Sequence, residues 1–174
     1  MDGKWRRSAW AAGALRDWLS DHGSLTRRLQ ARYPDFRVRR LSQSLQRPLQ
    51  DEYRPLKLRP GRLALVREVL LMAGDTPLVF AHSVIPVQGL AGPWAGLVGL
   101  GNRPLGAALF ADPRIRRHPL EIRRLDARRP LYRSASRHLD HPPHFLWARR
   151  SRFLLDGHAL QVTEVFLPDL LRQP

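Results

Sequence analysis

Two segments of the chain carry the pattern of a β-hairpin, and they constrain the fold more than any other feature. In the first, apolar-rich runs at 63–72 and 78–85 flank the turn Gly74-Asp75-Thr76-Pro77. In the second, runs at 145–155 and 159–167 flank Asp156-Gly157, and Asp-Gly is a strong signal for a tight hairpin turn. Hairpins join neighbouring antiparallel strands, so the sequence predicts an antiparallel sheet.

Helical patterns lie before and between the hairpins. Trp10, Leu15, Trp18 and Leu19 fall on one face of a predicted helix, and Ser24 is placed to cap a second helix over residues 26–32. The Gly-rich stretch 87–112 predicts two further helical pieces, the second at 105–110. Additional strands are expected near 36–40 and at 120–125, and the Pro-, Arg- and His-rich stretch 128–143 predicts a long loop.

This order of elements predicts an α+β fold, an antiparallel sheet flanked by helices. At 174 residues the chain fits one domain, so we expect a single domain over residues 1–174 with the first few residues loose. There is no repeated strand–helix–strand unit and no glycine fingerprint for binding phosphates.

Each hairpin places a charge in the middle of an apolar strand face. One face of the first strand reads Leu63, Leu65, Arg67, Val69 and Leu71, and one face of the last strand reads Leu160, Val162, Glu164 and Phe166. A buried charge needs a partner. Either Arg67 and Glu164 pair with each other as a structural ion pair, or they bind a ligand. If they bind a ligand, Arg67 would form two charge-assisted hydrogen bonds with a carboxylate. Glu164 would have a raised pKa and act as a general acid.

Which face of the first strand points inward stays open, because the opposite face of that strand carries Glu68. Two helix starts, at Ser24-Leu25-Thr26 and Arg103-Pro104-Leu105-Gly106, offer backbone N–H groups to an anion, although plain capping is the commoner role of such segments.

Other kinds of catalytic site find little support. His141-Pro142-Pro143-His144 only superficially resembles a metal-ligand spacing, because no acidic or Cys cluster accompanies it. There is no G-x-S-x-G turn for a serine hydrolase.

The composition points to a soluble, strongly basic protein. The net charge is +15, and all but two of the 30 Lys and Arg residues are Arg. This positive charge is compatible with three explanations: a nucleic-acid partner, a codon bias toward Arg, or an electrostatic field that attracts a small dianionic substrate. The chain lacks cysteine, an apolar leader at its start and a run long enough to span a bilayer. We therefore expect a cytoplasmic protein with no membrane span. Because the arginines are scattered and form no continuous basic stripe on a helix, we expect no nucleic-acid partner. We also expect a monomer.

Several segments resemble the chorismate lyase family of ubiquinone biosynthesis, in matching order and spacing. They are Ser24-Leu25-Thr26, Val66-Arg67-Glu68-Val69-Leu70-Leu71, Val84-Ile85-Pro86, Leu90 to Pro93, Leu100-Gly101, Arg103-Pro104-Leu105-Gly106, Leu109-Phe110, Leu146-Trp147-Ala148-Arg149-Arg150-Ser151-Arg152 and Thr163-Glu164-Val165-Phe166-Leu167-Pro168.

The resemblance implies an enzyme that splits chorismate into 4-hydroxybenzoate and pyruvate without any cofactor or metal. It implies Arg67 and Glu164 as catalytic residues, and Leu25, Leu105, Arg67 and Glu164 as substrate-binding residues around an enclosed pocket. The chain departs from the family at Leu25, where a Met is familiar, and in the length of the 128–143 stretch. The alternatives are a non-catalytic sensor of aromatic carboxylates and a basic nucleic-acid-binding protein.

Overall fold

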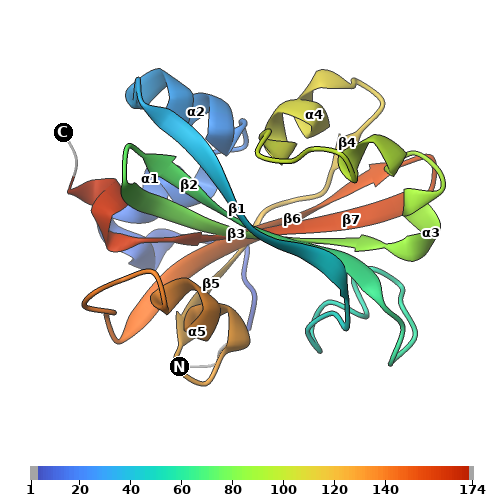
Figure 1. Cartoon of the computed structure of the whole chain (residues 1–174). Coiled ribbons are helices and arrows are strands. Elements are labelled where there is room, and N and C mark those ends of the chain that lie inside the picture. Colours follow the sequence, from blue (N-terminus) through green and yellow to red (C-terminus); the bar gives the residue numbers. More distant parts are fainter. Residues whose placement is uncertain (1–3, 173–174) are drawn as a thin grey trace.

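A seven-stranded antiparallel sheet organises the protein, as seen in the computed structural model, which describes residues 4–172 (Figure 1). The strand order is β1-β2-β3-β7-β6-β4, and β5 also pairs with β6. The strands are β1 (Phe36–Gln46), β2 (Ala64–Ala73), β3 (Thr76–Pro86), β4 (Arg116–Arg117), β5 (Glu121–Asp126), β6 (Phe145–Leu155) and β7 (His158–Phe166). The predicted α+β fold with an antiparallel sheet is confirmed. Residues 1–3, where we expected a loose start, lie outside the described residues.

Both predicted hairpins are present, as β2–β3 and β6–β7, and they pair with each other through β3 and β7. In the second turn Asp156 and Gly157 have φ of 47° and 79°. Tight hairpin turns that match the twist of their strands require positive φ at both central residues, which Asp-Gly tolerates. The local turn chemistry thus sets the register of the strands that carry the site.

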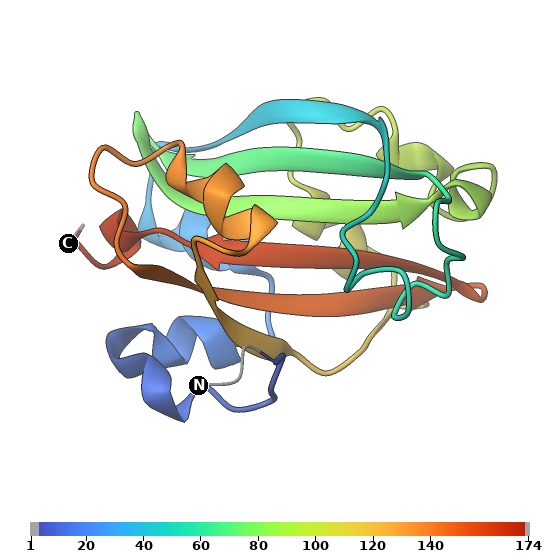
Figure 2. The ribbon, with the colours of Figure 1, turned by 90° about the horizontal axis from the view of Figure 1, so that it is seen from below.

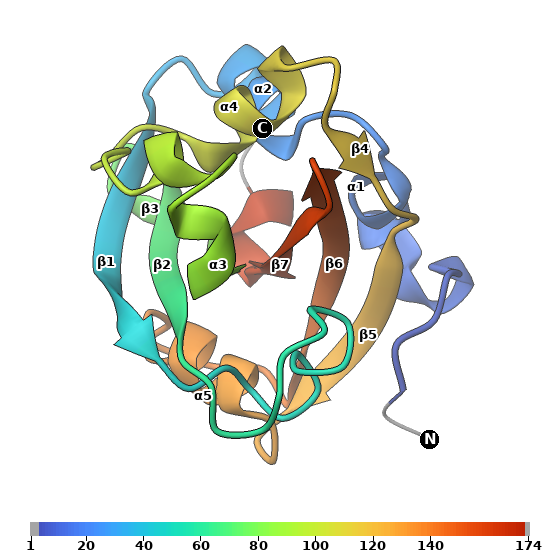
Figure 3. The same ribbon diagram turned by 90° about the vertical axis from the view of Figure 1, so that its right-hand side faces the viewer.

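Helices cover both faces of the sheet. They are η1 (Trp10–Leu15), α1 (Arg16–Ser20), α2 (Leu25–Arg32), α3 (Val87–Leu90), η2 (Ala95–Leu97), α4 (Leu105–Ala111), α5 (Pro130–Ser136) and η3 (Pro168–Leu171). Figure 1 shows α2 and α4 above the sheet and α5 below it. Seen from below, α5 and the loop 47–63 lie across the sheet (Figure 2). Seen along the strands, α2 and α4 close one side and the 47–63 loop the other (Figure 3).

Two local predictions are wrong. The stretch 128–143 contains the helix α5: Pro130 occupies its first turn, where a missing N–H costs nothing, and Leu131, Tyr132 and Ala135 are buried against the sheet. Trp10 is 72% exposed, although it was predicted on a buried helix face. The reason is that Gly13 interrupts η1 with φ 54°, so the regular helical periodicity does not extend from Trp10 to Trp18.

Both faces of β2 are covered by other parts of the chain, so both point inward. Arg67, Val69 and Leu71 point to the side of α2 and α4. The face that carries Glu68 points to the side of α5 and the 47–63 loop.

A polar row crosses this second face on five strands in direct register. It consists of Glu68 (β2), His82 (β3), Thr163 (β7), Arg150 (β6) and Glu121 (β5). His82 lies 3.1 Å from Glu68 and 3.2 Å from Glu52 of the 47–63 loop, and Arg150 lies 2.8 Å from Glu121. The charges of this row are therefore paired, as the burial of His82 and Arg150 requires.

Candidate functional site

A small cavity lies between the sheet and the starts of α2 and α4. Its volume is about 40 Å³, more than the roughly 10–15 Å³ that a cavity needs to hold one water molecule. Residues from both helix starts and from β1, β2, β3, β4, β6 and β7 line it: Leu25, Thr26, Val38, Arg67, Val69, Leu71, Ala81, Ser83, Pro104, Leu105, Gly106, Leu109, Phe110, Arg117, Ser151, Phe153, Val162 and Glu164. All four residues expected in the site are among them, so the structure brings Leu25, Arg67, Leu105 and Glu164 together.

Arg67 is held by backbone carbonyls and keeps an unused donor. Its side chain is 3% exposed, and Nη2 donates to the carbonyls of Gly101 at 2.9 Å and Arg103 at 3.2 Å. Its Nε is buried and has no hydrogen-bond partner among the described residues. Burial lowers the pKa of Arg67, and the charge of Arg40 lowers it further. A buried N–H of a charged group without a partner is costly, so this part of the cavity favours an anionic acceptor.

Glu164 is paired with Arg149, not with Arg67 as the structural alternative proposed. The two residues stand opposite each other on β7 and β6, and Nε of Arg149 lies 2.5 Å from Oε2 of Glu164. Arg149 is completely buried, and its Nη1 donates to the carbonyls of Trp18 and Asp21, each at 2.7 Å. Arg149 therefore fixes the Glu164 carboxylate and ties the segment before α2 to the sheet.

The starts of α2 and α4, which carry Leu25 and Leu105, touch each other. Ser24 caps α2 by accepting from the N–H of Arg27 at 3.3 Å, as predicted. A side-chain carbon placed on Gly106 would lie 3.0 Å from Oγ1 of Thr26 and 3.4 Å from Oγ of Ser24. The absence of a side chain at position 106 thus allows the two helix starts to close over the cavity.

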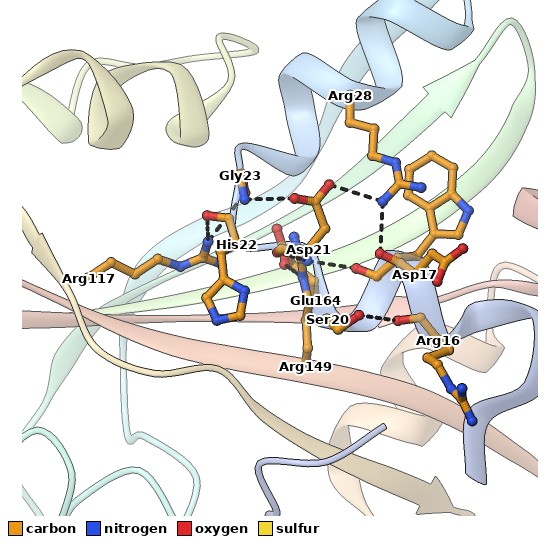
Figure 4. A network of polar contacts seen from close by, with 11 residues as sticks. Arg16, Asp17, Ser20, Asp21, His22, Gly23, Arg28, Arg117, Arg149 and Glu164 are labelled. Atoms are coloured by element: carbon orange, nitrogen blue, oxygen red, sulfur yellow. Dashed lines mark hydrogen bonds and ion pairs between the residues drawn. The ribbon is translucent and has the colours of Figure 1, made fainter. Parts of the chain in front are cut away.

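A network of charges sets the position of the segment before α2 (Figure 4). Asp21 accepts from the N–H of Gly23 at 2.7 Å and pairs with Arg28 at 3.0 Å, while Arg28 lies over the ring of Trp18. Although burial raises the pKa of Asp21, the contacts with Gly23 and Arg28 hold it below its usual value. These contacts fix where Leu25 enters the cavity wall.

Arg117 and Arg149 are two residues of this region that were not predicted as site residues from the sequence. Arg149 occupies the same face of β6 as Ser151 and Phe153, so strict alternation along 145–155 marks a charge on an apolar face there as well. Arg117 lies on β4, which has only two residues and gives no periodic signal. Within residues 4–172, no three His, Asp or Glu side chains are grouped as a metal ion would require. In the same range no helix has the length and apolar character needed to cross a membrane.

Solved structures with a similar fold include regulator domains. The ligand-binding domain of a putative GntR-family transcriptional regulator from Bordetella bronchiseptica superposes with a TM-score of 0.54 at 18% identity, covering 77% of this chain and 85% of that one. The effector domain of PhnF from Mycobacterium smegmatis gives a TM-score of 0.56 at 16% identity, covering 84% and 90%. At such low identity the likeness concerns the fold alone.

Sequence relatives identify the family. The family described as Chorismate lyase matches residues 4–173. A probable chorismate pyruvate-lyase from Thiobacillus denitrificans is 53% identical over 161 residues, covering 92% of this chain and 86% of the relative. One from Aromatoleum aromaticum is 52% identical over 165 residues, covering 92% and 88%. Because these matches extend over nearly its whole described length, the chain belongs to the chorismate lyase family.

Proposed function

We propose that this protein is a chorismate pyruvate-lyase, which converts chorismate into 4-hydroxybenzoate and pyruvate. The observation that carries the proposal is the cavity itself, which both Arg67, with its unpartnered Nε, and Glu164 line among mostly apolar residues. An apolar pocket with a few convergent polar groups suits a small ring with carboxylates. Membership of the chorismate lyase family indicates which reaction such a site catalyses.

Chorismate carries a ring carboxylate and an enolpyruvyl ether. Arg67 binds the ring carboxylate through charge-assisted hydrogen bonds, together with backbone N–H groups at Leu25 and Leu105. This assignment uses the buried Nε of Arg67, which the described residues leave without a hydrogen-bond partner. The ring is thereby oriented with its ether toward β7, the strand that carries Glu164.

Elimination breaks the bond between the ring carbon and the ether oxygen. The ring carbon that bears the hydroxyl group loses its hydrogen as a proton, which makes the ring aromatic, and the departing enolpyruvate gains a proton to become pyruvate. Arg149 holds Oε2 of Glu164, which leaves Oε1 for the substrate. Glu164 positions a proton at the ether oxygen. Aromatisation makes the overall reaction strongly downhill, and the proposed steps use neither a metal nor a redox cofactor.

Substrate binding requires the helix starts to separate. The cavity of about 40 Å³ is small for a substituted six-membered ring. The contact between Gly106 and Thr26 forms the seam between α2 and α4. The cavity therefore opens along this seam to admit chorismate and closes again to exclude water.

Incubation of the purified protein with chorismate tests the proposal. In the presence of a chelator, we expect absorbance of 4-hydroxybenzoate to rise together with an equal amount of pyruvate, measured with lactate dehydrogenase. The Arg67→Ala variant serves as the control for contaminating lyase, since it should lose this activity. A preparation that binds 4-hydroxybenzoate but never releases pyruvate would point to a sensor of aromatic carboxylates instead.

A further inference from the structure

The cavity contains a second guanidinium group, that of Arg117, at the opposite end from Arg67. Arg67, Ser83, Val162 and Ser151 stand in direct register across β2, β3, β7 and β6. Nε of Arg117 donates to Oγ of Ser151 at 2.9 Å. This row spans three strand spacings, roughly 14 Å between the outer backbones. The two guanidinium groups therefore face the cavity from its two ends.

Arg117 is held rigidly by its surroundings. Nη1 donates to the carbonyls of His22 at 2.7 Å and Gly23 at 3.3 Å. The guanidinium carbon lies 5.3 Å from the ring centre of Phe110 and 5.4 Å from that of Phe153. A guanidinium group packed against two aromatic rings loses little further freedom when it binds an anion. Figure 4 shows it reaching toward the His22–Gly23 backbone.

One nitrogen of Arg117 remains available. Nε and Nη1 are used by Ser151 and the backbone, whereas Nη2 makes no hydrogen bond within residues 4–172. Burial lowers the pKa of Arg117, and the charge of Glu164 raises it. The charge of Asp21 also raises this pKa, whereas that of Arg149 lowers it. Both carboxylates are already paired, Glu164 with Arg149 and Asp21 with Arg28. Arg117 therefore carries a charge that no side chain fully compensates.

The substrate of the proposed reaction has one carboxylate more than its aromatic product. Chorismate carries a carboxylate on the ring and another on the enolpyruvyl group, whereas 4-hydroxybenzoate keeps only the first. Glu164 on β7 lies between the strand of Arg67 and the side of Arg117 in the sheet order. With the ring carboxylate at Arg67 and the ether at Glu164, the enolpyruvyl carboxylate falls on the Arg117 side.

We propose that Arg117 binds the enolpyruvyl carboxylate and so distinguishes the substrate from the product. This inference rests on the proposed function. Arg117 would hold the leaving fragment while Arg67 holds the ring, so that the bond between them breaks with both ends fixed. After elimination the second carboxylate belongs to pyruvate, and 4-hydroxybenzoate no longer contacts Arg117.

The test compares the affinities of the two ligands in the same variants. Arg117→Met should raise KM for chorismate, or its Kd in a rapid-mixing experiment, at least about 30-fold, as expected when a carboxylate loses its buried cationic partner. The Kd of 4-hydroxybenzoate should change by no more than about twofold, the usual limit for a site that a ligand does not touch. Arg117→Lys should recover part of the chorismate affinity. Arg67→Ala should weaken both ligands.

Arg116→Ala is the matched control, because Arg116 is the exposed neighbour of Arg117 on the same strand. A parallel loss of both affinities in Arg117→Met would overturn the proposal and leave Arg117 as a structural tie to His22 and Gly23. Unchanged chorismate affinity would overturn it as well. Absence of pyruvate release by the wild-type protein is a different result, and it would contradict the proposed function.

Discussion

Arg149 donates from Nε to Oε2 of Glu164 over 2.5 Å, between directly opposed positions of β6 and β7. Because Arg149 also binds the carbonyls of Trp18 and Asp21, one guanidinium group serves both the carboxylate of the site and the segment that leads into α2. The geometry of Glu164 and the position of Leu25 are therefore coupled.

Replacing Arg149 should disturb stability as well as activity. Arg149→Met leaves Glu164 without its partner and removes both backbone contacts, so we expect the free energy of unfolding to fall by about 3–5 kcal/mol. Urea unfolding followed by circular dichroism measures this loss. Glu121→Gln is the control, because it removes the carboxylate partner of Arg150 on the other face of the sheet, where that carboxylate is 41% exposed. An Arg149→Met variant as stable as the wild type would contradict the coupling.

Glu164→Gln distinguishes a catalytic role of Glu164 from its structural role as the partner of Arg149. The amide keeps the shape of the side chain but carries no titratable proton. If Glu164 transfers a proton, kcat should fall roughly 10²–10⁴-fold, while 4-hydroxybenzoate still binds and the melting temperature stays close to that of the wild type. Melting temperature, product affinity and kcat are measured on one preparation. A stable variant with unchanged kcat would remove Glu164 from the mechanism.

Arg67→Ala should weaken both turnover and ligand binding. The loss of a charge pair in a buried site costs about 2–4 kcal/mol in kcat/KM, and Arg67→Lys should rescue only partly because the fork of donors is lost. Steady-state kinetics and product titration measure the two effects. Arg124→Ala, at an exposed position on β5, is the control. Near-normal kcat/KM in Arg67→Ala would refute the assignment.

Gly106→Ala tests the seam between the helix starts. The added carbon would lie 3.0 Å from Oγ1 of Thr26, so α2 and α4 should separate slightly, and 4-hydroxybenzoate should dissociate faster. Stopped-flow measurement of the dissociation rate detects this. Combining Gly106→Ala with Thr26→Ala removes the nearest atom and should restore slow release. Gly96→Ala is the control, since nothing lies within 4 Å of the added carbon there.

The free energy of unfolding should decrease as the pH becomes alkaline, because of His82. Burial lowers its pKa, but the hydrogen bonds to Glu52 and Glu68 outweigh burial and raise the pKa from 6.5 to about 9. A pKa raised in the folded state stabilises the protein fully below the unfolded value, and this contribution is lost as pH rises from about 6.5 through about 9. The loss is on the order of 3 kcal/mol, since one pKa unit corresponds to roughly 1.4 kcal/mol.

Thermal unfolding between pH 6 and pH 10 measures this contribution. His82→Gln should be less stable at pH 6 and should show a much flatter decline above pH 7. His141→Gln, which changes an exposed histidine, should follow the wild type. An identical decline in His82→Gln and the wild type would show that another group is responsible.

The hairpins and their charges were predictable from sequence because they depend on local chemistry. Asp156-Gly157 sets a turn, and alternation along β2 and β7 marks Arg67 and Glu164 as charges on apolar faces. What sequence alone could not supply were the contacts between distant segments. The partner of Glu164 depends on the register of β6 against β7, and Arg117 reaches the cavity from a two-residue strand. The helix α5 was missed because its many Arg, Pro and His neighbours resemble a loop, although Leu131, Tyr132 and Ala135 share a helix face.

The polar row on the second face of the sheet has a consequence for how the chain avoids misfolding. Strands can slip by two residues without exchanging their faces, so alternation alone does not prevent such errors. A slip of β3 against β2 by two residues would set His82 opposite Val66 or Leu70 instead of Glu68. It would bury a histidine and a carboxylate without partners. The charges of the row therefore favour one alignment of the strands over slipped ones. This alignment is also the one that brings Arg67, Glu164 and Arg117 to a common cavity.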